Sequence, residues 1–208
     1  MATVTETEAT PESLEALPRE YPPHHLTVER FERMVNAGIF GDKSPIFLWH
    51  GRLVEKMTKG DPHIFSVLAL SKILDRLLPE GWHTWPESPV RVGDDGMPEP
   101  DLSIVRGRPR DYLGRKPSVQ DTALLIEVAD SSLAIDSGDV LRTFAVEGFP
   151  VYWIVNIPKR RVEVYREPTG PSDRPGYQSC HHFGPGERVP VVLDGHEVGE
   201  IAVDDFLP

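Results

Sequence analysis

The residues of this sequence best suited to chemistry are two carboxylates, Asp101 and Glu127, each at the edge of a short apolar run. The runs, 102–105 and 124–128, have the length and composition of buried β-strands. If these strands pair, the two carboxylates come to neighbouring positions, as oxygen ligands of a hard divalent cation usually do. A bound Mg²⁺ or Mn²⁺ could then make water more acidic and neutralise a phosphate. The structural alternative is that Asp101 caps a turn and Glu127 is one exposed strand residue among 33 acids.

The histidines and the cysteine give weaker signals. His63 follows Asp61 at the expected start of a helix, where it either faces a cleft or interacts with the helix end. The triplet Cys180-His181-His182 has the residue types of a soft-metal site. Adjacent residues in a strand point to opposite faces, however, so all three cannot reach one ion without a bulge. We therefore expect no zinc site at the triplet.

A basic segment, residues 106–116, directly follows the Asp101 strand in this otherwise acidic chain. It contains a single acid and five cationic side chains, Arg106, Arg108, Arg110, Arg115 and Lys116. Such a loop could follow a phosphate backbone and carry Tyr112 toward a base, which predicts DNA binding. A loop that only faces solvent is the alternative. A smaller basic patch at 159–161 is expected to face solvent.

The elements that must position these residues follow from the apolar periodicity. Helical spacing predicts helices over 28–35, over 64–78 and over 139–147. Alternating or continuous apolar runs predict strands at 46–49, 53–57, 82–85, 90–92, 102–105, 124–128, 151–155, 162–165, 189–193 and 198–203. Because the strands and helices do not repeat as strict βαβ units, we expect an α/β (α+β) fold with a mixed β-sheet flanked by helices.

Composition sets the domain organisation and the cellular setting. Residues 1–23 are rich in Thr, Glu, Ala and Pro and predict a disordered tail, followed by one domain over 24–208. The single cysteine fits a reducing cytoplasm, and the N-terminus does not resemble a signal peptide. No apolar run approaches the ~20 residues of a membrane span. The net charge of −11 repels nucleic acid, so DNA binding requires a local basic surface or a metal.

Several of these segments together carry a family resemblance. They are 51–57, His63, 99–105, 125–133 with Asp136, and 148–155. In order and spacing they resemble the putative restriction endonuclease family of the PD-(D/E)XK nuclease superfamily, from about residue 26 to the C-terminus. The resemblance implies a restriction-endonuclease-like fold, with Asp101 as the aspartate of the PD element and Glu127 as the metal-binding glutamate. Glu55, Lys56 and His63 become accessory candidates.

The sequence departs from the family pattern at two site-facing positions. The family lysine lies on the helix eight residues before the glycine matched by Gly148, and that position is Val140. A family glutamate lies four residues before Gly51, where this chain has Phe47. A valine cannot orient an attacking water or offset charge on the phosphate. Arg142 lies about 200° around the helix from position 140, which leaves Lys56 as the nearest substitute.

Two functional hypotheses therefore stand side by side, and a third interpretation is an unrelated structural domain that neither binds DNA nor is stabilised by cations. The first is a Mg²⁺- or Mn²⁺-dependent DNA endonuclease with Asp101 and Glu127 as catalytic metal ligands, impaired by the loss of the family lysine and glutamate. The second is a non-catalytic DNA-binding or protein-interaction module that keeps the nuclease fold. A homodimer is expected, because cutting both strands with one site per chain favours two-fold symmetry. The observation that best separates the hypotheses is whether a lysine ammonium reaches the space beside the two carboxylates.

Overall fold

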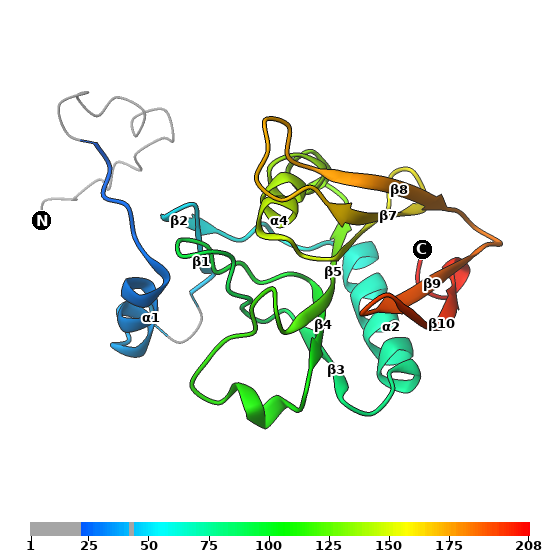
Figure 1. The fold of residues 1–208 in the computed structure, drawn as a ribbon, viewed down its shortest axis with the longest axis horizontal. Helices are drawn as coiled ribbons and strands as arrows, with labels where there is room; N and C mark the ends of the chain where they lie inside the picture. Colours follow the sequence, from blue (N-terminus) through cyan, green and yellow to red (C-terminus); the bar gives the residue numbers. More distant parts are fainter. Residues whose placement is uncertain (1–21, 42–43) are drawn as a thin grey trace, which may run out of the picture.

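The computed structural model describes residues 22–41 and 44–208 and is organised around one six-stranded mixed sheet (Figure 1). The strand order is β3–β4–β5–β6–β7–β8, and only the central β5–β6 pair is parallel. The bounds are Trp82–Pro86, Leu102–Arg106, Thr122–Ala129, Val151–Asn156, Arg161–Pro168 and Tyr177–Phe183. A parallel pair needs a crossover, and the helical segment between β5 and β6 provides it. The expected α/β fold with a mixed sheet is confirmed.

The antiparallel β4–β5 pairing decides which residues meet. Leu102 is paired with Ile126, and continuing this register by one residue brings Asp101 opposite Glu127. A one-residue slip would turn every side chain of a strand to the other face of the sheet. The apolar residues of β5 prevent such a slip, because Leu124 and Ile126 are fully buried on one face and Leu125 on the other.

Helices cover both faces of the sheet. Helix α2, Asp61–Leu77, packs Val67, Leu70 and Leu74 into the larger core cluster, with the small sheet formed by β9 (Arg188–Leu193) and β10 (His196–Ala202) beside it (Figure 1). The opposite face is covered by α4, Leu141–Glu147, whose Phe144 packs in the second cluster. Glu127 shares the α4 face of β5 with Leu125, since alternate strand residues point the same way.

The N-terminal segments form a third core cluster with Met97 of the loop between β3 and β4. Helix α1, Val28–Asn36, begins at Thr27, whose hydroxyl accepts the backbone N–H of Arg30. The hairpin of β1 (Ile46–Trp49) and β2 (Arg52–Glu55) turns through His50 and Gly51, both with positive φ, as a tight two-residue hairpin turn requires. Its Leu48 is buried against this cluster, and the chain leaving β2 leads to α2.

Most elements expected from the sequence are present, with two corrections. Residues 90–92 form no strand, although Val90 and Val92 are buried and Arg91 is half-buried. Their three backbone N–H groups bond to the carbonyls of Pro98, Pro117 and Gly96, which lie in separate segments. The helix expected over 139–147 begins earlier, as a helical run of α3 (Leu133–Ile135), a π-turn (Asp136–Val140) and α4. Residues 1–21 of the predicted tail lie outside the described residues. In the described part of the chain, no helix has the length and apolar character of a membrane span.

Candidate active site

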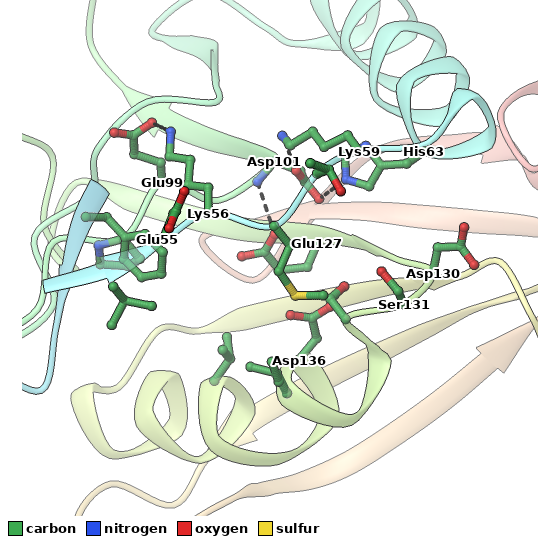
Figure 2. A pocket seen from close by; sticks show the side chains of 18 of the residues that line it. Glu55, Lys56, Lys59, His63, Glu99, Asp101, Glu127, Asp130, Ser131 and Asp136 are labelled. Atoms are coloured by element: carbon green, nitrogen blue, oxygen red, sulfur yellow. Dashed lines mark hydrogen bonds and ion pairs between the residues drawn. The ribbon is translucent and has the colours of Figure 1, made fainter. Parts of the chain in front are cut away.

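A cavity of about 240 Å³ lies where the loop after β2, the start of β4, the end of β5 and the crossover helices meet (Figure 2). It contains both predicted carboxylates, Asp101 and Glu127. The backbone N–H of Asp101 donates to Glu127 Oε2 at 3.2 Å, so the two acids are adjacent across the β4–β5 pair. This adjacency is what strand pairing predicts for these two residues.

The orientation of Asp101 is fixed by three partners. Its Oδ2 accepts the backbone N–H of Val128 at 2.8 Å and lies 2.9 Å from His63 Nε2. Because an ionised carboxylate only accepts, Nε2 carries the proton of this contact. Oδ1 faces the ammonium of Lys59 at 2.8 Å. Burial raises the pKa of Asp101, but the bonds from His63 and Lys59 outweigh it and lower the pKa overall, so Asp101 is an anion at neutral pH.

The pKa values of Glu127 and Asp136 are raised, whereas that of Asp101 is lowered. Burial, followed by the negative charges of Asp101 and Asp136, raises the pKa of Glu127 well above its usual range. Asp136 is 7% exposed on the π-turn, and burial is the main cause that raises its pKa to about 6, although the Ser132 hydroxyl at 2.5 Å opposes the rise. Burial therefore holds two of the acids that line the cavity, Glu127 and Asp136, back from ionising.

Lys59 is the site residue that sequence reasoning missed. It lies in the loop between β2 and α2, and its ammonium contacts Glu87 Oε1 at 2.6 Å as well as Asp101. Burial lowers the pKa of Lys59, but the two carboxylates outweigh that effect and raise it, so the ammonium stays charged. Its sequence signal is weak, because a lysine beside Gly60 is ordinary loop composition. Its spacing of four residues before His63 was the available hint.

Glu87, whose side chain binds Lys59, has a strained backbone. Glu87 directly follows β3 and has φ of 44°, a left-handed conformation that costs a non-glycine residue on the order of 1–3 kcal/mol. Its N–H donates to the carbonyl of Asp101 at 3.2 Å. The end of β3, the start of β4 and the loop after β2 are thereby joined around one ammonium.

The two departures from the family pattern both line this cavity. Phe47 of β1 and Val140 of the π-turn contribute apolar wall there. The substitute considered from the sequence, Lys56, also lines the cavity but pairs with Glu99. Glu55 lines the same wall, whereas Arg142 lines a separate hollow beside His50. The lysine that contacts the acidic pair is therefore Lys59, through its bond to Asp101.

The predicted DNA-binding loop leaves the sheet at the other end of β4. Arg106 lies five residues from Asp101, about 17 Å along an extended strand. Its guanidinium pairs with Asp194 and stacks 4.5 Å over the Trp82 ring. The four other cations of the loop differ in pairing. Arg108 pairs with Asp111, and Arg115 binds Asp121 through two bonds of 2.7 and 2.9 Å. In the described chain no ion pair involves Arg110 or Lys116.

Hard oxygen donors in the cavity suit a divalent cation. In the described ranges 22–41 and 44–208, no three histidine, cysteine or acidic side chains converge as a complete metal site. Mg²⁺ keeps several waters and needs only one or two protein carboxylates, so Asp101 and Glu127 fit it in type and position. A cation bound to Asp101 Oδ1 would share that oxygen with Lys59, or displace it.

The structure is that of an α/β protein with an acidic cavity beside the central strands of a mixed sheet. The crystal structure of a putative nuclease belonging to DUF820 from Anabaena variabilis ATCC 29413 has a TM-score of 0.61 to this chain, at 16% identity over 87% of this chain and 97% of that one. At that identity the likeness concerns the fold. The family model Uma2, described as putative restriction endonuclease, matches residues 28–201, and the chain belongs to this family. No curated protein matches.

Proposed function

We propose that this protein hydrolyses phosphodiester bonds of DNA as an endonuclease dependent on Mg²⁺ or Mn²⁺. The observation that carries the proposal is the adjacency of Asp101 and Glu127 in one cavity of a nuclease-family fold. Asp101 and Glu127 would hold the cation. When bound, the cation would supply positive charge against the phosphate and make water more acidic.

The residues of the chain have separate tasks in this reaction. The oxygen of the attacking water forms a bond to phosphorus, and the bond from phosphorus to the bridging sugar oxygen breaks. The water loses a proton to solvent, and the leaving sugar oxygen gains one from solvent. His63 and the N–H of Val128 keep Asp101 pointed into the cavity. Phe47, Val140 and Phe144 supply an apolar wall, which strengthens electrostatic interactions at the phosphate.

DNA is proposed as the substrate because the chain belongs to a family described as restriction endonucleases. The net charge of −11 means that contact with a duplex must come from local cations, and Arg110 and Lys116 are the candidates without an ion pair in the described chain. A homodimer remains our proposal for cutting both strands. The single cysteine, Cys180, is the observation behind a proposed cytoplasmic location.

A second candidate function is a non-catalytic DNA-binding or protein-interaction module. It is favoured by one observation, the presence of Phe47 and Val140 in the cavity wall where the family has charged groups. Under this candidate, the acidic pair survives but water is not activated, and the expected cleavage rate is reduced by ~100-fold or more.

Plasmid cleavage by the purified full chain tests the proposal. Supercoiled DNA is incubated with Mg²⁺, Mn²⁺ or EDTA, and nicked and linear forms are quantified. We expect conversion that requires the cation and is abolished in Asp101→Asn. A wild type as inactive as Asp101→Asn under both metals would refute the endonuclease. If cleavage appeared only in the double variant Phe47→Glu, Val140→Lys, the second candidate would hold.

A further inference from the structure

We propose that Lys59 is the catalytic lysine of this site and takes the place of the lysine that is absent at position 140. Its ammonium contacts a non-bridging oxygen of the scissile phosphate and opposes the charge that grows there as water attacks. The inference rests on the proposed hydrolysis of DNA. It assigns to the loop after β2 a task that the family pattern gives to the crossover helix.

The first support is position. Lys59 and Val140 line the same cavity from different elements, the loop after β2 and the π-turn (Figure 2 labels Lys59 beside Asp101). A catalytic ammonium acts through the position of its charge relative to the phosphate. The long side chain of lysine can place this charge beside the phosphate from either side of the cavity. Val140 is apolar and itself contributes no charge that would compete with the ammonium.

The second support is the availability of the ammonium. Lysine has three N–H donors, and the described residues use two of them, for Asp101 Oδ1 and Glu87 Oε1. Its side chain is 31% exposed, so the third donor can be reached from the cavity. A phosphate oxygen is a strong acceptor for such a donor, and the bond is charge-assisted.

The third support is that Asp101 is oriented by two partners besides Lys59. Its Oδ2 already has two partners, His63 and the N–H of Val128, which together orient the carboxylate. Lys59 is added at Oδ1, the oxygen on which a cation and a substrate would converge. It is held there by Glu87, a residue with a strained backbone, and strain of this kind concentrates at functional sites.

The reaction balances without a further reactant. The water oxygen bonds to phosphorus, the phosphorus–sugar oxygen bond breaks, and the protons involved pass to and from solvent. Lys59 remains an ammonium throughout and neither takes up nor releases a proton. It therefore contributes charge and orientation, and it is not the general base.

A lysine exchange between the two walls tests the inference. Single-turnover cleavage of plasmid with Mn²⁺ is compared among wild type, Lys59→Met, Val140→Lys and the double variant Lys59→Met, Val140→Lys. We expect Lys59→Met to lose about 100-fold or more in rate while its affinity for a short duplex changes by less than about tenfold. The double variant should recover at least about tenfold of the loss. Lys72→Met, on the exposed side of α2, removes the same charge as a matched control.

The outcomes separate this inference from the proposed function. If wild type cleaves and Lys59→Met cleaves at the same rate, the Lys59 assignment is wrong and the endonuclease stands. If Lys59→Met is slow and unstable to heat, and Val140→Lys does not restore its rate, Lys59 is a structural counter-ion and the assignment is again wrong. If wild type is inactive but Val140→Lys is active, Lys59 does not replace the missing lysine. If none of the variants cleaves, the proposed function itself fails.

Discussion

Replacement of Asp136 by asparagine should stabilise the protein, and only above about pH 4. The carboxyl is 7% exposed, and burial raises its pKa to about 6, from an ordinary value of 3.8. Below pH 4 the carboxyl is protonated in both states, so it contributes nothing. Between pH 4 and 6 the unfolded chain ionises while the native carboxyl stays protonated, and the native state loses about 1.4 kcal/mol for each pH unit. The loss reaches about 3 kcal/mol and is constant above pH 6.

Urea unfolding at pH values from 4 to 8, in EDTA, measures this dependence. The advantage of Asp136→Asn should be near zero at pH 4, grow to about 3 kcal/mol by pH 7, and correspond there to about 6–12 °C in Tm. The amide retains an oxygen that can accept the Ser132 hydroxyl, so this bond is not lost. An advantage equal at pH 4 and pH 7.5 would show that the effect is packing, and would refute the electrostatic reasoning.

Asp121→Asn is the control of opposite sign. The bonds from Arg115 lower the pKa of Asp121 to about 2, so its native anion contributes stability that is present above the unfolded pKa. This stability is lost as pH falls through about 2. The variant should therefore be less stable than wild type by a nearly constant amount from pH 4 to 8. Urea unfolding extended to lower pH should show the difference shrink as the pH falls from about 4 to about 2.

Two further predictions concern ligands. Ca²⁺ should raise the stability of wild type by about 2.7 kcal/mol at a hundredfold excess over its Kd, and should not stabilise Asp101→Asn. Calorimetry measures both, and equal stabilisation of the two proteins would place the cation elsewhere. The double variant Arg110→Ala, Lys116→Ala should bind a short duplex more weakly and lower the slope of log affinity against log salt by about one to two. Lys72→Ala with Lys159→Ala removes the same charge from exposed positions of α2 and the β6–β7 turn, and an equal loss there would remove the loop from the interface.

The acidic pair could be predicted from the sequence because local patterns determine it. The apolar runs that become β4 and β5 are buried on both faces, and pairing them in register brings Asp101 opposite Glu127 without further information. The earlier start of the crossover helix could not be predicted in this way. Residues 133–138 include Ser137 and Gly138, which are weak helix formers. Their helical path is supported by tertiary contacts, among them the Tyr152 hydroxyl that donates to the Asp136 carbonyl at 3.2 Å.

Lys59 shows why reasoning by position fails at a cavity. A family pattern records which sequence position carries a charge, whereas the phosphate responds only to where the charge lies. Segments far apart in the chain meet at this cavity, so a charge lost from the crossover helix can be supplied by a loop on the facing wall. The position of the Lys59 ammonium is set by its ion pairs with Glu87 and Asp101. Both partners are distant in sequence, so the residues around Lys59 do not predict either pair. Substitutions at catalytic positions should therefore be judged by the charges that surround the cavity before activity is considered lost.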